Sequence, residues 1–331
     1  MDQADFDRVM SLVEDDMTPA QRLAVGALAE AANAKDAVQT ALAVREARLE
    51  KDRTCPSCAK AALVRHGSDR NGLGRFRCLG CGGTCTALTG TPLARIFRRD
   101  LLVPFLEATL ERKSLVRIAD ELGVCVPTVL AWRHLVLAMP ATERKALLGG
   151  IVEADETFFL ESRKGSKGPT PGHAARPSRH RGSGALLRGL SKEQVPVATA
   201  LDREGGIVEA VLDGRSSVEI RRALAPSLEE HSVLCSDGLP AYKDLSALRR
   251  CVHRVVAPQH PSPAAKAAGL PRGRKGALGL GRVNSFHEAL KTGINRIFRG
   301  VSTRFLANYA ALERIVRQGV DSLGLLGRLL A

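Results

Sequence analysis

The stretch "GGIVEADETFFLESRKG" (residues 149–165) decides how the second half of the chain folds. The apolar side chains at 151–152 and 158–160 predict a buried strand, yet three carboxylates lie between them. A buried carboxylate is costly unless it is paired or binds a metal ion. Because side chains alternate between the faces of a strand, Glu153 and Asp155 share one face and Glu156 lies on the other.

A second acidic residue follows another apolar run, in "VLCSDGLPAYKDL" (residues 233–245), where Asp237 ends a predicted strand. Asp155 and Asp237 could meet at one edge of a sheet. Two such acids suit Mg²⁺, which binds through one or two carboxylates and keeps several waters for a phosphate to replace. From the residues alone, the alternative is equally open: Asp237 caps a helix and Asp155 is solvated at the surface.

The surrounding pattern alternates short strands with helices, which predicts an α/β domain. A Gly/Pro-rich basic segment follows the first strand at residues 162–184, and another lies at 258–282. We expect both to hold DNA through its phosphates. Helices are predicted from Asn284 to the end. The predicted strands are 151–160, 194–202, 206–213 and 232–237, with a helix at 216–231.

Composition narrows the class of protein. The 331 residues allow two or three domains, and a hydrophobic content of 44% allows a sizeable core. The net charge of +14 suits a polyanionic partner such as nucleic acid. No apolar run reaches transmembrane length, and the N-terminus is acidic and amphipathic, unlike a signal peptide. We therefore expect a cytoplasmic, nucleoid-associated protein without a membrane partner.

Two CxxC pairs, Cys55/Cys58 and Cys78/Cys81, predict a structural zinc site. Each pair presents two thiolates from one turn, so two pairs complete a tetrahedron around Zn²⁺ and leave no open coordination position. The intervening segment is basic and contains glycines, which is typical of a zinc ribbon. Free structural cysteines are the less favoured reading, and the basic surface fits DNA phosphate or plain solvent equally well.

The segment "SLVRIADELGVCVPTVLAWRHLVL" (residues 114–137) has the spacing of a helix-turn-helix. Gly123 falls where the turn needs a positive φ, and Pro127 is tolerated in the first turn of the second helix. That helix would offer Thr128 and Arg133 to DNA. An ordinary helical hairpin is the alternative.

Several motifs together resemble the transposases of the IS1595 (ISXO2-like) insertion-sequence group, over nearly the whole chain. The resemblance rests on "EADETFFLESRKG", "HRGSGALLRGLSKEQVPV", "SDGLPAYK", "VNSFHEALK" and "FRGVSTRFLANYAALER". It implies a zinc ribbon, a DNA-binding helical region and a ribonuclease-H-like catalytic domain of the DDE class. It also implies double-stranded DNA as the partner and a homo-oligomer that joins two element ends.

The resemblance assigns catalytic roles by position. Asp155 and Asp237 match the first two acids, and His287 stands where the third residue of the family's N-x-x-E motif would be glutamate. An imidazole suits Mn²⁺ better than Mg²⁺, so either ion is expected. Glu288, the next residue, is an alternative third ligand. On a helix, Asn284, His287 and Lys291 share one face, and we expect Asn284 and Lys291 to contact DNA.

We therefore predict a multidomain α+β protein with a helical N-terminal arm (1–50), a zinc ribbon (51–92), a helix-turn-helix region (93–148) and a ribonuclease-H-like domain (149–331). Its expected function is metal-dependent strand cleavage and strand transfer at the ends of an insertion sequence. One alternative is a non-catalytic DNA-binding regulator derived from a transposase, for which the zinc ribbon and helix-turn-helix would suffice. Another is a structure-selective nuclease on the same fold, which would need the acids without end-specific binding.

Overall fold

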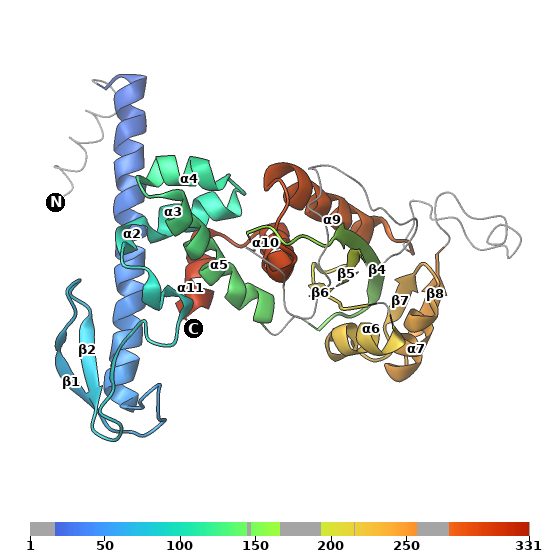
Figure 1. The fold of residues 1–331 in the computed structure, drawn as a ribbon, viewed down its shortest axis with the longest axis horizontal. Helices are drawn as coiled ribbons and strands as arrows, with labels where there is room; N and C mark the ends of the chain where they lie inside the picture. The colour runs from blue at the N-terminus through green and yellow to red at the C-terminus, as the bar shows by residue number, and fades with distance from the viewer. Residues whose placement is uncertain (1–16, 144–146, 166–192, 215, 257–277, 331) are drawn as a thin grey trace, which may run out of the picture. The chain divides into compact units, whose positions relative to one another are not determined.

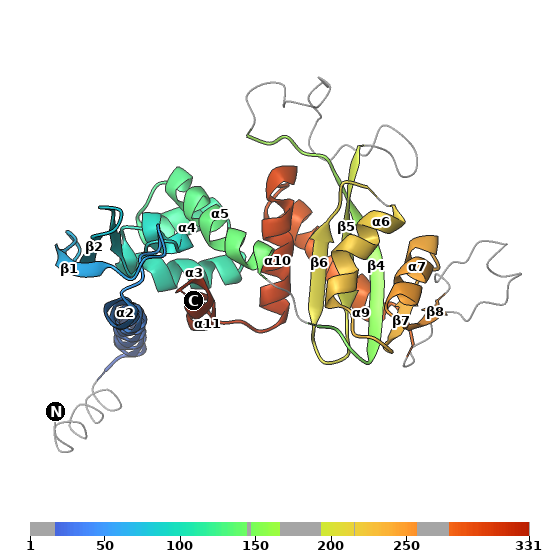
Figure 2. The same cartoon turned by 90° about the horizontal axis from the view of Figure 1, so that it is seen from below.

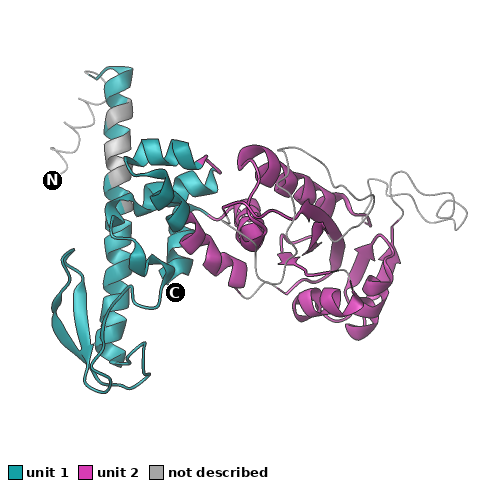
Figure 3. Cartoon of the chain, viewed as in Figure 1, with its two compact units in different colours: residues 1–111, 115–132, 321–331 teal, residues 112–114, 133–320 magenta. Residues whose placement is uncertain are grey.

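The computed structural model describes residues 17–143, 147–165, 193–214, 216–256 and 278–330. Most of both predicted basic loops, 166–184 and 258–277, lies outside these ranges, as do the first 16 residues of the predicted N-terminal arm. The chain divides into two compact units (Figure 3). Unit 1 comprises residues 1–111, 115–132 and 321–331, and unit 2 comprises 112–114 and 133–320.

Unit 1 combines a long helix with a small antiparallel sheet (Figure 1). The long helix begins with a capping box in which Thr18 and Gln21 satisfy each other's backbone N–H groups. The sheet order is β1-β2-β3. Its elements are α2 (Pro19–Asp52), β1 (Leu63–Ser68), β2 (Gly74–Cys78), β3 (Thr84–Thr86), η2 (Pro92–Arg95), η3 (Arg99–Leu101), α3 (Leu102–Leu110), α4 (Leu115–Leu122), α5 (Val126–Thr142, through Trp132) and α11 (Ser322–Leu330).

Unit 2 is built on a five-stranded mixed sheet of order β6-β5-β4-β7-β8. The central strand β4 pairs antiparallel with β5 and parallel with β7, and β8 continues the parallel half. The strands are β4 (Ile151–Leu160), β5 (Gln194–Leu201), β6 (Ile207–Val211), β7 (Val233–Ser236) and β8 (Val252–Val255). The helices are α6 (Ser217–Leu224), η4 (Ala225–Ser227), α7 (Pro240–Leu248), α9 (Gly281–Lys291), the π-helix η5 (Thr292–Ile297), η6 (Thr303–Phe305) and α10 (Leu306–Arg317).

Helices cover both faces of this sheet, α6 and α7 on one and α9 and α10 on the other (Figures 1 and 2). Val152 and Ala154 of β4 enter the apolar core with Ile220 of α6 and Leu245 of α7. The opposite face of β4 carries Glu153 and Asp155 toward α9. The alternation read from the sequence therefore places the two acids on the helix α9 side, away from the main apolar core.

The four strands predicted in this half of the chain are present, and β8 is a fifth that the sequence reading missed. Val252 is exposed and the strand is only four residues long, so it carries little hydrophobic signal. Pro140 lies inside α5. It stands in the last turn, only two residues before the helix ends at Thr142, so the hydrogen bond that its missing N–H removes lies at the end of the helix. Within the described ranges, no single helix is long and apolar enough to cross a membrane, although α4 and α5 pass by length and composition when taken as one bent pair.

Candidate active site and metal centre

The parallel strands β4 and β7 bring two aspartates to neighbouring positions. Their register pairs Glu153 with Cys235, so Asp155 and Asp237 each lie two residues further along adjacent strands. Asp237 comes directly after β7 and accepts a hydrogen bond from the N–H of Leu239 at 3.1 Å, before the start of α7. The two acids therefore lie on neighbouring strands where the parallel pairing of β4 and β7 ends, Asp155 within β4 and Asp237 just beyond β7.

The surroundings of the Asp155 carboxyl disfavour its charged form. Its side chain is 21% exposed, and burial raises its pKa to about 7, with further upward contributions from Asp237 and Glu156. The Glu156 N–H, which donates to Asp155 Oδ1 at 2.8 Å, and the ammonium of Lys291 act in the opposite direction. A cation beside the two aspartates would remove the cost of holding both charges together.

His287 reaches this pair from helix α9. Its imidazole is 6% exposed, with Nδ1 4.0 Å from Asp155 Oδ2. Burial, together with Lys291, lowers the pKa of His287 to about 4, so the ring is neutral at pH 7 and can act as a ligand. Its Nε2 atom is buried, and the described part of the chain offers it no hydrogen-bond partner. Such an unsatisfied buried nitrogen calls for a ligand.

The other predicted residues of α9 lie at its surface. Asn284, Glu288 and Lys291 are all exposed, whereas His287 is buried. Lys291 is close enough to lower the pKa of both Asp155 and His287. Glu288 is not among the main causes of the Asp155 pKa shift. The structure therefore groups His287 and Lys291 with Asp155 and leaves Glu288 toward solvent.

Glu153 holds the first turn of α9 against strand β4. Its carboxylate is 1% exposed and accepts hydrogen bonds from the backbone N–H groups of Arg282 at 2.7 Å and Val283 at 3.2 Å, in the first turn of α9. Arg203 donates to the same carboxylate at 2.7 Å. A carboxylate at a helix N-terminus is favoured by the macrodipole. Glu153 thus fixes the helix of His287 to the strand of Asp155.

Glu156 faces the other side of the sheet. Tyr242 of α7 is fully buried there, and its pKa is raised well above 10 by burial and by the charge and hydrogen bonding of Glu156. Sequence reading gave neither Glu153 nor Glu156 a specific role. Arg203 and Arg282 were also missed, because nothing local in the sequence reports a contact to a strand more than forty residues away.

The donor set of Asp155, Asp237 and His287 fits a divalent cation. Two carboxylates and an unsatisfied imidazole nitrogen are ligands that Mn²⁺ and, with less preference for nitrogen, Mg²⁺ accept. The arrangement is more open than a closed metal site. Among the described residues, only the four cysteines of unit 1 have His, Cys, Asp or Glu ligand atoms that all lie within 4.8 Å of one another.

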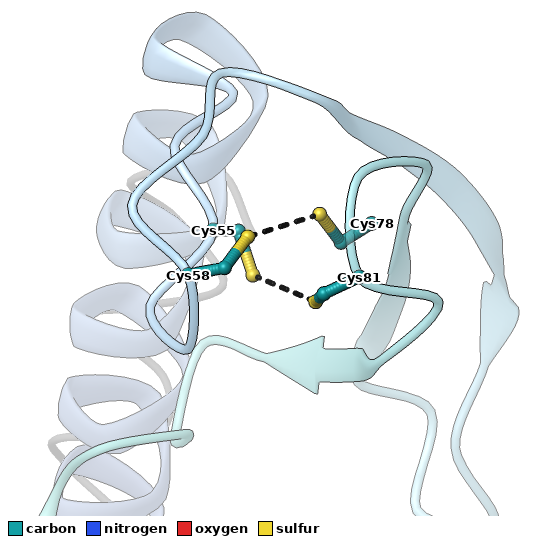
Figure 4. A group of neighbouring side chains, drawn as sticks. All are labelled: Cys55, Cys58, Cys78 and Cys81. Carbon is teal, nitrogen blue, oxygen red and sulfur yellow. Dashed lines mark hydrogen bonds between the residues drawn. The ribbon is translucent and has the colours of Figure 1, made fainter.

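Those four cysteines form the second candidate metal centre (Figure 4). The Sγ atoms of Cys55 and Cys81 are 3.9 Å apart, and those of Cys58 and Cys78 are 3.6 Å apart. A tetrahedron with Zn–S bonds of ~2.3 Å has edges of about 3.8 Å, so the sulfurs could hold one zinc ion. The sequence prediction of a four-cysteine cluster is confirmed.

The two CxxC turns have the same backbone hydrogen bonds. In the first, Ala59 N–H donates to the Cys55 carbonyl at 2.8 Å; in the second, Gly82 N–H donates to the Cys78 carbonyl at 2.8 Å. Both residues are left-handed, with φ of 58° at Ala59 and 71° at Gly82. The turns are therefore pre-shaped to point their thiols toward each other.

Helices α4 and α5 are joined by a three-residue turn in which Gly123 has φ of 64°, and the helix axis bends by 109° between them. This geometry lies within the range of a helix-turn-helix. Thr128, in the first turn of α5, is partly exposed, and its hydroxyl contacts Cys125 Sγ at 3.0 Å.

Arg133 does not reach the surface of α5. It is 1% exposed, its guanidinium donates to the carbonyl of Lys113 at 2.7 Å, and it lies 5.4 Å from the centre of the Phe298 ring. Val129 and Val136, four residues before it and three after it, are also fully buried, so the helical period places Arg133 on the inner face. The guanidinium supports packing, and we remove Arg133 from the DNA-contacting set.

These features define a mixed helix-and-sheet protein with two groups of potential metal ligands. The family model of the ISXO2-like transposase domain matches residues 147–312, about half of the chain. The chain therefore belongs to this transposase family, the IS1595 family. This agrees with the resemblance of its motifs.

Solved structures of Mos1 transposase are distant neighbours of this chain. A pre-cleavage transpososome is 14% identical, over 64% of this chain and 75% of that chain, with a TM-score of 0.20. The strand transfer complex is 15% identical, over 65% and 74%, also with a TM-score of 0.20. A paired-end complex with the left transposon end is 15% identical, over 66% and 77%, with a TM-score of 0.19. These likenesses are too weak to carry an argument. The comparison with curated proteins gave no match.

Proposed function

We propose that this protein is a DNA transposase that binds the ends of its insertion sequence and carries out divalent-metal-dependent strand cleavage and strand transfer. The observation that carries the proposal is the grouping of Asp155, Asp237 and the buried imidazole of His287, whose Nδ1 lies 4.0 Å from Asp155 Oδ2 and whose Nε2 has no hydrogen-bond partner among the described residues. A regulator without catalysis would need none of these groups together. Family membership of residues 147–312 points the same way.

The strand order supports a ribonuclease-H-like assignment for unit 2. In chain order the described strands are arranged 3-2-1-4-5, with the second antiparallel to the first and the fourth and fifth parallel to it. Asp155 lies on the first strand and Asp237 follows the fourth. This assignment completes the proposed α+β architecture, in which the helices α4 and α5 form the helix-turn-helix and the cysteine-rich sheet forms the zinc ribbon.

In the proposed mechanism, Asp155, Asp237 and His287 hold the catalytic ion. A divalent ion bound there would supply Lewis-acid chemistry, lowering the pKa of a bound water or hydroxyl and stabilising the leaving oxygen of an in-line displacement. His287 is the third ligand in this proposal because its Nδ1 is 4.0 Å from Asp155, whereas Glu288 is exposed. The nitrogen ligand favours Mn²⁺ over Mg²⁺.

The remaining residues orient the site and the DNA. Lys291 places a positive charge beside Asp155, where it attracts the scissile phosphate. Glu153 holds α9, so that His287 and Lys291 keep their places relative to Asp155. Asn284 and Thr128 are proposed DNA contacts from α9 and α5. The zinc-bound cysteines would have a purely structural role, since four thiolates close the coordination sphere.

Double-stranded DNA is the proposed partner, as element end and as target. Joining two ends requires at least two active sites, so we propose a homo-oligomer on DNA. An enzyme with these substrates works where the DNA lies, which places it with the nucleoid.

The test uses the purified full-length chain and a plasmid that carries its gene with the flanking DNA. Strand breaks are mapped in Mg²⁺ and separately in Mn²⁺, beside an Asp155→Asn variant. The proposal expects breaks at inverted repeats that bracket the gene, stronger in Mn²⁺ and absent in the variant. Specific binding without breaks in either metal would contradict catalysis and favour the regulator, and breaks without end specificity would favour the nuclease.

A further inference from the structure

A basic segment follows directly after the helix of His287. Between Glu288 and Glu313 the chain contains no acidic residue, and it carries four basic ones, Lys291, Arg296, Arg299 and Arg304. All four side chains are exposed, and none forms an ion pair with a carboxylate among the described residues. Lys291 lies near Asp155, so the three arginines are the cations of this segment that have no carboxylate beside them among the described residues, and they make the segment strongly positive.

The backbone that presents these cations is unusual. Helix α9 passes without a break into the π-helix η5, a form that is rare and frequently found at functional sites. Arg299 and Gly300 then adopt left-handed conformations, with φ of 53° and 82°. A left-handed arginine is disfavoured by its Cβ, so this turn has to be held by other contacts.

Those contacts come from the end of β4. Lys164 Nζ donates to the carbonyl of Gly300 at 2.8 Å. Thr303 N–H donates to the Ser162 carbonyl at 2.9 Å, while Ser162 N–H donates to the Thr303 hydroxyl at 2.7 Å. Phe298 anchors the other side, its ring 4.8 Å from that of Tyr309. The turn is thus fixed on both sides, and its arginines lose little backbone freedom when they bind a ligand.

We propose that residues 295–304, here called the arginine turn, bind the phosphodiester backbone of duplex DNA beside the proposed active site, through Arg296, Arg299 and Arg304. This inference rests on the proposed function for the position of the DNA. Arginine is suited to the role because its guanidinium donates two parallel hydrogen bonds to a phosphate. No base is read, so this contact adds affinity and register without sequence preference.

The spacing along the chain predicts which phosphates are bound. Arg296 lies nine residues after His287, which is at most about 14 Å at the α-helical rise of ~1.5 Å per residue, because residues 292–296 belong to the π-helix. For a duplex whose axis runs along α9, one strand has a phosphate every ~3.4 Å, so Arg296 lies about four nucleotides from the phosphate at His287. The predicted contacts therefore lie about four to six nucleotides from the cleaved bond.

The first experiment measures how the affinity of the full-length protein for a duplex oligonucleotide depends on salt. Each phosphate contact adds about 0.9 to the slope of log K against log salt. Arg296→Ala combined with Arg299→Ala should lower the slope by about 1.8, so the loss of affinity between about 50 and 200 mM salt should shrink by about 12-fold. Replacement of both by lysine should keep the slope.

The matched control is Arg222→Ala, an exposed arginine on α6, on the opposite face of the sheet from α9. Its slope should equal that of the unchanged protein. A double alanine variant with the same slope as this control would overturn the inference. The outcome is separate from catalysis: a protein that binds DNA with the full slope but never cleaves it contradicts only the proposed function.

A second experiment locates the contact. Neutral methylphosphonates are placed singly along the cleaved strand once the ends are known. The unchanged protein should lose affinity for substitutions about four to six nucleotides from the cut, and the double alanine variant should be insensitive to the same substitutions. Equal sensitivity of both proteins at these positions would show that other residues bind these phosphates.

Discussion

The clamp between Glu153 and the start of α9 gives the sharpest prediction about stability. Replacing Glu153 by alanine removes a carboxylate that is 1% exposed and leaves three donors without their acceptor. Val283 is fully buried, so its N–H gains no water in exchange. An unsatisfied buried donor costs about 1–3 kcal/mol, and a hydrogen bond to a charged group contributes about 1.5–3 kcal/mol.

Arg203 adds less to this loss. Its side chain is 31% exposed, so water can solvate the guanidinium once the carboxylate is gone. We therefore expect Glu153→Ala to lower the free energy of unfolding by about 3–5 kcal/mol, the range for a broken buried ion pair. For a unit of this size that corresponds to a fall in Tm of roughly 10 °C. Glu153→Gln keeps an acceptor oxygen and should cost about 1–2 kcal/mol.

The assay combines urea unfolding with hydrogen exchange, and Glu209→Ala is the matched control. Glu209 is also a buried carboxylate, 2% exposed, and it pairs with Arg314 of α10 at 3.1 Å rather than with the first turn of α9. Both variants should be destabilised, but only Glu153→Ala should speed exchange at the Arg282 and Val283 amides. A loss below about 1 kcal/mol, or unchanged exchange at these amides, would refute the clamp.

Three further outcomes follow from the two metal centres and from His134. Cys58→Ser should reduce bound zinc from one ion per chain to almost none and should destabilise unit 1. The control is Cys85→Ser, which lies beside the cluster but not in it and should keep the ion. Zinc is measured colorimetrically after denaturation, and an equal loss in both variants would contradict the assignment of ligands. His287→Ala should slow strand cleavage by about 100-fold or more, which is a loss of about 3 kcal/mol of transition-state stabilisation. Glu288→Ala should cleave within a few-fold of the rate of the unchanged protein. The reverse order of the two rates would make Glu288 the ligand. Burial, with Arg304 and Arg133, lowers the pKa of His134 to about 4, so the unfolded chain binds more protons between about pH 4 and 6.5, and stability should fall as pH drops through that window. A His134→Phe variant should show a flatter dependence of Tm on pH in this window, and an unchanged dependence would mean that other groups set it.

The candidate metal ligands could be predicted from the sequence largely because their spacing is local. Two residues between cysteines fix a turn that aims both thiols, and the strand period alone puts Glu153 and Asp155 on one face. The sequence allowed Asp155 and Asp237 to meet, and the parallel register of β4 and β7 brings them to neighbouring positions. In each case, the positions of the candidate ligands follow from residues a few positions apart or from the alternation of side chains along a strand.

Other features depend on contacts between distant parts of the chain, and these could not be read in advance. Glu153 finds its partners at Arg282 and Val283, and nothing near Glu153 in the sequence announces a helix terminus there. Arg133 is a charged residue that the helical period assigns to the interior, where its guanidinium donates one hydrogen bond to the Lys113 carbonyl. Charge suggested a DNA contact, but burial decided its role.

The most direct test of the central claim exchanges one proposed metal ligand. With the element ends known, cleavage of an end-containing duplex is measured for Asp237→Cys in Mg²⁺ and in Mn²⁺. A thiolate is a poor ligand for Mg²⁺, whereas Mn²⁺ accepts softer ligands. If Asp237 holds the catalytic ion, cleavage is lost in Mg²⁺ and restored in Mn²⁺. Equal cleavage in the two metals, at the level of the unchanged protein, would show that Asp237 does not hold the ion and would contradict the account.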